Sequence, residues 1–581
     1  MDRKGIIAVS LAIAVLIAWM YRNNQEMSKA AKALPVKVTE VKAATGVAED
    51  AAVVAPVAPV VAESVGVPVV AEQKETIKTP LVEYTFSSLG GGISTALLNQ
   101  FVSEGDHKMI LNEFGSIPMG MVSEVAGEGG LAPFEMKVEG NTVTFDRTDQ
   151  RKVQLTKKFT VASSGLPKEG YVVKLAVTFT NRGAEPIALP GRYIYTGSAA
   201  PVHESDLATY TGFMEAGGKF IDTTYFDSGW FHAERPTFTV AKESIAWAGV
   251  ADQYFVTLVT QVPAVVTGVP VAKRGGAAWA KRFTIAEGRW TGTGHESRNT
   301  TAVRYGINGA LGLSAITLAP GESATENFEI YAGPREYGIL RGMADDQVAI
   351  MDFGIFSIVS RTLLISMNWL KSVLGSYALA IIVLTLVIKS LLWPMQNKST
   401  QSMKRMQLLQ PKMTELKEKF KDDPARMNTE VMKLYKDYGV NPLSGCLPML
   451  IQMPIFFGFF GMLGKAVELR NSTFLWVHDL SLPDTIFRIP SLGWPVNILP
   501  IVMAGTMLWQ MMLSPKSGDQ SQQRIMMFMP LIFIAFCYNY ASALALYWTV
   551  QNLFSVAQLY LTRNAAPPTL QKLVVATKGK K

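Results

Sequence analysis

The segment AIIVLTLVIKSLLWPM, residues 380–395, is an apolar run with a single charged side chain, that of Lys389. With its flanks, the run is long enough for a helix that crosses about 30 Å of hydrocarbon. A lysine inside the bilayer costs up to about 3 kcal/mol on insertion scales, and such residues often mark functional sites. The alternative is that Lys389 snorkels, because Met395 lies only about 9 Å further along the helix axis. The segment therefore predicts a membrane span and raises the question of what its ammonium contacts.

The composition agrees with a membrane protein that carries a large soluble part. The chain has 581 residues, of which 49% are hydrophobic, and its two cysteines, Cys446 and Cys537, lie in apolar stretches. Cysteines placed in this way predict neither a disulfide framework nor a cysteine metal site. The histidines lack ligand spacing, and GFFGMLGKA, which resembles a phosphate-binding loop, has Ala466 where that motif needs a hydroxyl. We expect no metal, no cofactor and no enzymatic activity.

Six apolar runs are candidate membrane spans, at residues 5–21, 376–395, 447–465, 494–513, 525–541 and 543–561. The first has the composition of either a cleavable signal peptide or an uncleaved anchor. Because Trp19, Met20 and Tyr21 stand where a small-residue cleavage site is needed, we favour an anchor over residues 1–22. The predicted fold class is a multi-pass α-helical membrane protein with six transmembrane helices.

Lysine and arginine residues in the flanking segments predict the orientation of these spans. Segment 396–445 is rich in both, and the tail 563–581 carries basic residues without an acid: Arg563, Lys572, Lys578, Lys580 and Lys581. Both segments are therefore expected in the cytoplasm, together with the N-terminus. Residues 23–375 then lie on the outer side.

The external segment divides by composition into a linker and a β-rich domain. Residues 23–77 are rich in Ala, Val and Pro and lack periodicity, which indicates a flexible linker. Residues 78–340 contain short strand-like runs separated by Gly and Pro. In YVVKLAVTFTNRG, for example, every second residue is apolar: Val173, Leu175, Val177 and Phe179. This pattern predicts a large, all-β antiparallel sandwich.

Two further segments predict helices outside the spans. Residues 350–375 are interrupted by Arg361 and Lys371, so they predict an amphipathic helix in the outer interface. Residues 396–442 predict a cytoplasmic helical hairpin that turns near Pro424. Its apolar stripes include Met403, Met406, Met413 and Met427. They are interpreted either as the core of a solvated connector or as an adaptable surface for apolar partners.

Several segments of the second half carry a family resemblance. VNPLSGCLPMLIQMPIFFGFF at 440–460, FLWVHDLSLPD at 474–484 and MMFMPLIFIAF at 526–536 resemble signature segments of the YidC-type membrane protein insertases. The charged hairpin sequence that precedes them resembles the same family in spacing and charge. AWAGVADQYF at 246–255 resembles the external domain of its Gram-negative branch. The match covers essentially all of residues 350–562, and several independent segments agree in order.

The resemblance implies a fold, a location and a candidate site. It implies a β-supersandwich in the periplasm and a five-helix insertase core at 376–562 in the inner membrane. It also implies a hydrophilic groove that opens to the cytoplasm and holds one cation, at the position of Lys389, where many members have arginine. Thr385 lies on the same helical face as Lys389. Gln452, Gln551 and Asn552 are further candidates for the polar lining.

The function implied is the insertion and folding of integral membrane proteins, alone or beside a Sec translocon. Nascent membrane proteins, the ribosome and the lipid bilayer are the expected partners, without a small-molecule substrate. The basic tail residues Lys572, Lys578, Lys580 and Lys581 are candidates for a ribosome contact. Two alternatives are a secondary transporter of a small anion, for which no repeated halves are visible, and an assembly scaffold whose external domain binds partners.

Overall fold

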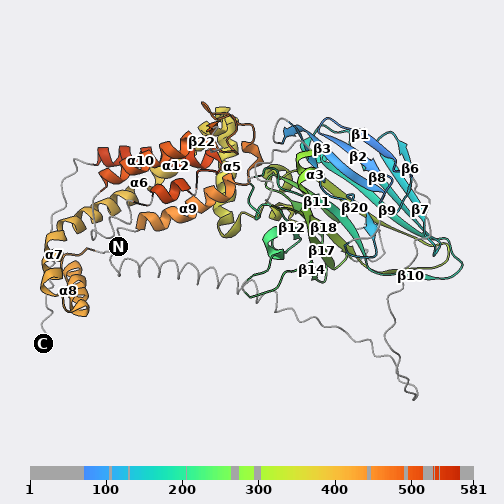
Figure 1. Cartoon of the computed structure of the whole chain (residues 1–581), viewed down its shortest axis with the longest axis horizontal. Helices are drawn as coiled ribbons and strands as arrows, with labels where there is room; N and C mark the ends of the chain where they lie inside the picture. Colours follow the sequence, from blue (N-terminus) through green and yellow to red (C-terminus); the bar gives the residue numbers. More distant parts are fainter. Residues whose placement is uncertain are drawn as a thin grey trace, which may run out of the picture. The chain divides into compact units, whose positions relative to one another are not determined.

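The computed structural model of the chain (Figure 1) describes its β-rich and helical regions. The described residues are 71–103, 107–127, 131–204, 206–229, 231–262, 274–292, 303–440, 447–489, 495–514, 528, 530–535 and 537–562. The predicted anchor at 1–22, most of the predicted linker and the basic tail 563–581 lie outside them, as does Cys446.

Twenty strands form the β-domain, which is antiparallel in every pairing between described strands. They are β1 Lys74–Lys78, β2 Val82–Ser87, β3 Gly92–Val102, β4 Lys108–Leu111, β5 Val122–Ser123, β6 Glu135–Glu139, β7 Thr142–Thr148, β8 Val153–Val161, β9 Val172–Asn181, β10 Ile187–Leu189, β11 Arg192–Ala199, β12 Gly212–Glu215, β13 Ile221–Asp222, β14 Phe238–Ala241, β15 Trp247–Ala251, β16 Phe255–Val262, β17 Ala277–Ile285, β18 Arg304–Leu313, β19 Ile316–Leu318 and β20 Ser323–Pro334. Short helices α2 Pro167–Gly170, α3 Glu287–Gly292 and α4 Tyr337–Leu340 join or follow them.

Two large sheets account for most of this domain. The larger has nine strands in the order β13-β12-β15-β16-β20-β9-β8-β7-β6, and the smaller has five in the order β14-β17-β18-β11-β5. A four-stranded sheet, β1-β2-β3-β4, adds to them. Edge-to-face packing of Phe159 against Phe86 and Phe145, at ring-centroid distances of 5.5 and 5.7 Å, helps hold the sheets together.

Strand β9 confirms the predicted alternation. Val173, Leu175, Val177 and Phe179 are buried, whereas Lys174 between the first two is exposed. The strand pairs with β8 on one side and β20 on the other, so both of its edges are hydrogen-bonded within the sheet. The β-rich region begins earlier than expected, because β1 starts at Lys74 inside the stretch assigned to the linker and pairs with β2.

Arg335 joins the end of β20 to two other segments. The guanidinium is fully buried and donates hydrogen bonds to the carbonyl oxygens of Asp252 and Ile350, each at 2.5 Å. The Asp252 carboxylate accepts from the backbone N–H groups of Tyr254 and Phe255. Burial nevertheless raises the pKa of Asp252 from 3.8 to about 7, because removal of water penalises the charged form.

The raised pKa of Asp252 predicts a pH-dependent stability. The folded state holds this proton more tightly than the unfolded state, so the contribution is full below about pH 4 and is lost as the pH rises to about 7. Asp252→Asn does not titrate, and its amide oxygen still accepts both backbone bonds. The Tm of this variant minus the Tm of wild type should therefore increase by roughly 5 °C from pH 5 to pH 8. Thermal unfolding of the purified chain at both pH values measures this. An unchanged Tm difference would contradict the prediction.

Residues 530–535 of the C-terminal region are helical, and seven further helices and one small hairpin there have described bounds. They are α5 Ser357–Leu374, α6 Tyr377–Leu408, α7 Gln410–Lys419, α8 Pro424–Asp437, α9 Leu447–Leu463, β21 Thr485–Arg488, β22 Pro495–Asn497, α10 Ile498–Leu513 and α12 Ser542–Leu561. The short 3-10 turns η3 Gln347–Met351 and η4 Gly354–Phe356 precede α5. Among the described residues α6 is long and apolar enough to cross a membrane, and the C-terminal fourteen residues of α9 and the whole of α10 form shorter apolar helices.

Helix α6 differs from the prediction for residues 376–395. It continues through Pro394 as one helix to Leu408, so the first arm of the expected hairpin begins inside α6. The turn near Pro424 is confirmed: α8 begins there, and the Asp423 carboxylate accepts from the Arg426 N–H at 3.0 Å. A proline is tolerated at this first helical position because the N–H it lacks would have no intrahelical partner.

Helix α5 covers most of the predicted interfacial segment. One face is buried, with Leu363, Leu364 and Met367, while Ile358 and Trp369 on the other face are exposed. The helix ends at Gly375, whose left-handed backbone (φ +77°) lets its N–H bond the Lys371 carbonyl. An apolar exposed face of this kind suits a lipid interface.

Candidate functional site

Lys389 lies on α6 and is buried, with 4% of its surface exposed. Its ammonium donates to the Ser555 hydroxyl oxygen on α12 at 3.3 Å. Ser555 in turn donates to the Gln551 carbonyl, so its oxygen is free to accept from the lysine. An ammonium has three N–H donors, and in the described part of the chain Ser555 is the one partner of Lys389, with no carboxylate paired to it. The cation therefore has spare donors in a buried position.

Gln452 on α9 forms a second polar contact with α12. Its amide nitrogen donates to the Tyr547 hydroxyl at 2.8 Å and to the Gln551 side-chain oxygen at 2.9 Å. Because Ser555 bonds the Gln551 carbonyl, Gln551 connects this contact to that of Lys389. Three predicted residues from three helices are thus brought into one polar cluster.

The other two predicted residues make separate contacts. Asn552 points toward α10, where its amide nitrogen donates to the Met503 carbonyl at 3.3 Å and the Thr506 hydroxyl at 3.2 Å. Thr385 is buried and donates to the Ile381 carbonyl of its own helix at 2.7 Å. Asn552 therefore ties α12 to α10, and Thr385 has its hydroxyl proton committed within α6.

Ser555, Tyr547 and Gln558 also contribute polar contacts here and are not among the residues predicted from the sequence. Gln558 donates to the Asn397 side-chain oxygen on α6 at 2.9 Å, beyond the Lys389 contact toward the α7–α8 hairpin. Gln551, Ser555 and Gln558 recur at intervals of four and three residues, so they form a buried polar stripe along α12. The spacing of these polar residues in a largely apolar segment could have identified them from the sequence.

Aromatic side chains pack beside the polar cluster. Tyr547 stacks on Phe459 with ring centroids 4.1 Å apart, and Trp548 meets Phe456 edge-on at 4.8 Å. These contacts lie on α9 and α12, the helices that carry Gln452 and Gln551. They fix the spacing of the two helices and keep the cluster's surroundings apolar, which strengthens the polar contacts inside it.

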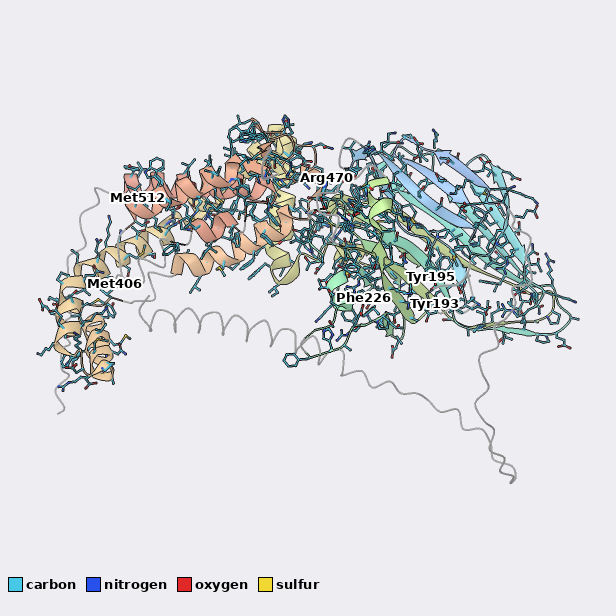
Figure 2. The ribbon with its side chains drawn as sticks, in the orientation of Figure 1. Tyr193, Tyr195, Phe226, Met406, Arg470 and Met512 are labelled. Atoms are coloured by element: carbon cyan, nitrogen blue, oxygen red, sulfur yellow. The ribbon has the colours of Figure 1, made fainter. Side chains whose placement is uncertain are left out.

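The hairpin of α7 and α8 has a small core of its own. Leu409, Tyr435 and Val440 are buried there, and Met406 and Met413 pack against them. Figure 2 shows Met406 near the point where α6 gives way to α7. Met403 and Met427 are half-buried, and the most exposed methionine of this segment is Met432, at 59%. The predicted tail residues Lys572, Lys578, Lys580 and Lys581 lie outside the described residues.

Comparison with known proteins gives two family matches that together cover most of the chain. Residues 369–569 match the family described as 60Kd inner membrane protein. Residues 74–366 match the family described as YidC periplasmic domain. The first match contains α6 to α12 with the polar cluster, and the second contains all strands of the β-domain.

Individual relatives match over nearly full length. A protein of Syntrophus aciditrophicus named membrane protein insertase YidC is 30% identical over 97% of this chain and 100% of its own length. A protein of Geotalea daltonii with the same name is 30% identical over 98% and 100%. Among solved structures, an active YidC insertase with its first transmembrane domain resolved matches 85% of this chain and 93% of its own, at 17% identity and a TM-score of 0.34.

Proposed function

The chain belongs to the YidC family of membrane protein insertases, and from that membership we propose how it receives and releases its substrates. It is a non-enzymatic inner-membrane protein with a periplasmic β-domain, and its substrates are membrane proteins. The proposal concerns the topology of the chain, the site that accepts the substrate and the segments that first contact it.

The proposed topology has six spans with both termini in the cytoplasm and residues 23–375 in the periplasm. The length of α6 and the apolar character of α9 and α10 support it. The basic residues of segment 396–445 favour a cytoplasmic hairpin by the positive-inside rule. Helix α5 then lies in the outer interface with Ile358 and Trp369 toward lipid.

The substrate is proposed to enter a cytoplasm-open groove around Lys389. The lining of this groove also includes Thr385, Gln452, Gln551 and Asn552. The observation that carries this is the buried ammonium whose one described partner is a serine hydroxyl. A substrate's polar tail can supply carbonyl or carboxylate oxygens to the unused donors, which offsets part of the cost of leaving water. Its apolar segment then moves into lipid, driven by burial of apolar surface.

Site-specific photocrosslinking tests this assignment. A photoreactive residue at Gln551, within the cluster, should crosslink to the polar tail of a stalled nascent membrane protein. The same residue at Leu553, which is 43% exposed on the same helix, serves as the control and should crosslink to lipid or to the apolar segment. Equal capture of the tail at both positions, or none at Gln551, would overturn the assignment.

The cytoplasmic hairpin and the basic tail are proposed to meet the substrate and its ribosome first. Met403, Met406, Met413 and Met427 would give an adaptable apolar surface once the hairpin's small core opens. Lys572, Lys578, Lys580 and Lys581 would contact ribosomal RNA through charge. A Sec translocon is proposed as a second partner for larger substrates.

Truncation after Arg563 tests the role of the tail. We expect co-sedimentation with ribosomes at low salt to fall several-fold, because counterion release makes such binding depend on the number of basic contacts. Full-length protein in high salt should resemble the truncated chain at low salt. Co-sedimentation that stays at the full-length level at every salt concentration would refute the ribosome contact.

A further inference from the structure

Two hairpins lie between α9 and α10. In the first, Phe474 and Val477 exchange both backbone hydrogen bonds, at 2.9 and 2.8 Å, so Leu475 and Trp476 form a two-residue tip. Leu475 adopts a left-handed backbone with φ +51°. Tips of this geometry favour Asn or Gly, which tolerate positive φ. The chain instead places a leucine there, and its side chain is 75% exposed.

The second hairpin, β21–β22, exposes another apolar pair. Ile486 and Phe487 have 48% and 57% of their surfaces exposed. The pairing register shifts between Thr485 and Phe487, an irregularity of the kind that re-aims side chains at a strand edge. Arg488 follows directly, is exposed, and has no carboxylate partner among the described residues.

One carboxylate fixes both hairpins to the start of α10. Asp484 is buried, and its Oδ2 accepts from the Trp476 indole N–H at 3.1 Å and from the Leu499 backbone N–H at 2.6 Å. Asp484 also immediately precedes β21. The Leu475–Trp476 tip and the apolar pair of β21 are therefore held beside the helix end, and the indole keeps its hydrogen bond while its ring stays 38% exposed.

The exposed apolar surface continues along α10. Ile501 and Val502 near its start are exposed, as is Met512 at its far end, labelled in Figure 2. Sixteen residues of helix span about 24 Å, which is shorter than the roughly 30 Å of a bilayer's hydrocarbon core. Asp484 holds both apolar pairs at the start of this helix, the end where the missing length is needed.

We propose that Leu475, Trp476, Ile486 and Phe487 insert into the outer leaflet of the membrane and anchor the periplasmic ends of α9 and α10. The inference rests on the proposed topology, which places this segment on the periplasmic side. A tryptophan with a satisfied N–H and an exposed ring suits the bilayer interface. Arg488 stands where it can meet a lipid phosphate. Insertion would place the exposed Leu475 side chain in lipid and would remove all four apolar side chains from water.

Fluorescence depth measurements on the full chain test the anchor. Single cysteines at Leu475, Phe487 and the control site Leu166, introduced after Cys446→Ser and Cys537→Ser, are labelled with an environment-sensitive dye in phosphatidylethanolamine–phosphatidylglycerol nanodiscs. Leu166 is a matched exposed leucine of the β-domain, at 64%. Labels at 475 and 487 should be quenched by lipids that carry a shallow spin label. The label at 166 should be quenched only by aqueous iodide.

Two other outcomes would overturn the anchor. Quenching of the 475 label by iodide alone would place the tip in water, and protection from both quenchers would mean that protein covers it. A label at Val387, exposed on α6, checks the topology separately, since it should be quenched by deep spin-labelled lipids even if the anchor is wrong. Leu475→Asn, which relaxes the turn, should at least halve lipid quenching of the 487 label; unchanged quenching would also refute the proposal.

Discussion

Lys389→Glu should reduce insertion of substrates with acidic tails by more than about a hundredfold. Two like charges about 6 Å apart at an effective dielectric constant of about 20 repel by roughly 3 kcal/mol, where wild type attracts. Lys389→Arg should retain activity, because the guanidinium keeps the charge and can still donate to Ser555. Lys389→Ala should be intermediate and should spare substrates with uncharged tails, whose apolar segments supply most of the driving force. An insertion assay with paired acidic-tail and neutral-tail substrates, at matched protein levels, measures these differences.

Lys398→Glu is the matched control for this reversal of charge. Lys398 lies on the same helix but is exposed, so screening by solvent should leave its substitution with little effect. A lysine that only snorkels gives another pattern: the alanine variant would be as active as wild type for every substrate. Equal activity of Lys389→Ala and Lys389→Glu on substrates with acidic tails would refute the proposal that Lys389 receives the substrate's tail.

Arg335→Ala should lower the free energy of unfolding of the β-domain by roughly 3–5 kcal/mol. The substitution leaves the Asp252 and Ile350 carbonyls without the donors that pair them, in a site closed to water. It also opens a cavity, because the side chain is fully buried. Thermal unfolding and limited proteolysis of the purified chain should both report the loss.

Two substitutions separate the role of Arg335 from a general charge effect. Arg335→Lys keeps the charge, but a single ammonium lacks the planar fork that reaches both carbonyls, so it should recover only part of the stability. Arg341→Ala removes an exposed arginine six residues later and should change the free energy of unfolding by less than about 0.5 kcal/mol. Similar losses for Arg335→Ala and Arg341→Ala would contradict the structural role.

Features encoded over a few neighbouring residues were predictable from the sequence. The alternation of Val173, Leu175, Val177 and Phe179 is local, and the sheet preserves it. The start of α8 follows from Asp423 and Pro424, a cap and a first-turn proline. In each case the pattern and the backbone geometry it favours involve the same short stretch of chain, so tertiary packing had little to change.

Features that depend on which helices pack together were not predictable in the same way. Lys389 and Gln452 could be chosen as polar residues in apolar runs, but their contacts with Ser555 and Tyr547 depend on the rotation of α12. The extension of α6 past Pro394 is a further example: proline weakens a helix locally, and contacts further along, such as that of Lys404 with the Thr562 carbonyl, support its continuation.

The uninterrupted α6 has a mechanical consequence. Pro394 has no N–H, so the Ser390 carbonyl loses its usual partner and the helix is most compliant there, just after Lys389. The segment from Pro394 to the end of α6 at Leu408 then acts as a rigid arm whose hinge lies beside the buried ammonium. Asn397 and Lys404 brace this arm against α12. A load on the hairpin that breaks these two braces would turn the arm about this weak point, whereas Lys389, on the other side of it, would keep its contact with Ser555. The hairpin can therefore swing without displacing the cation.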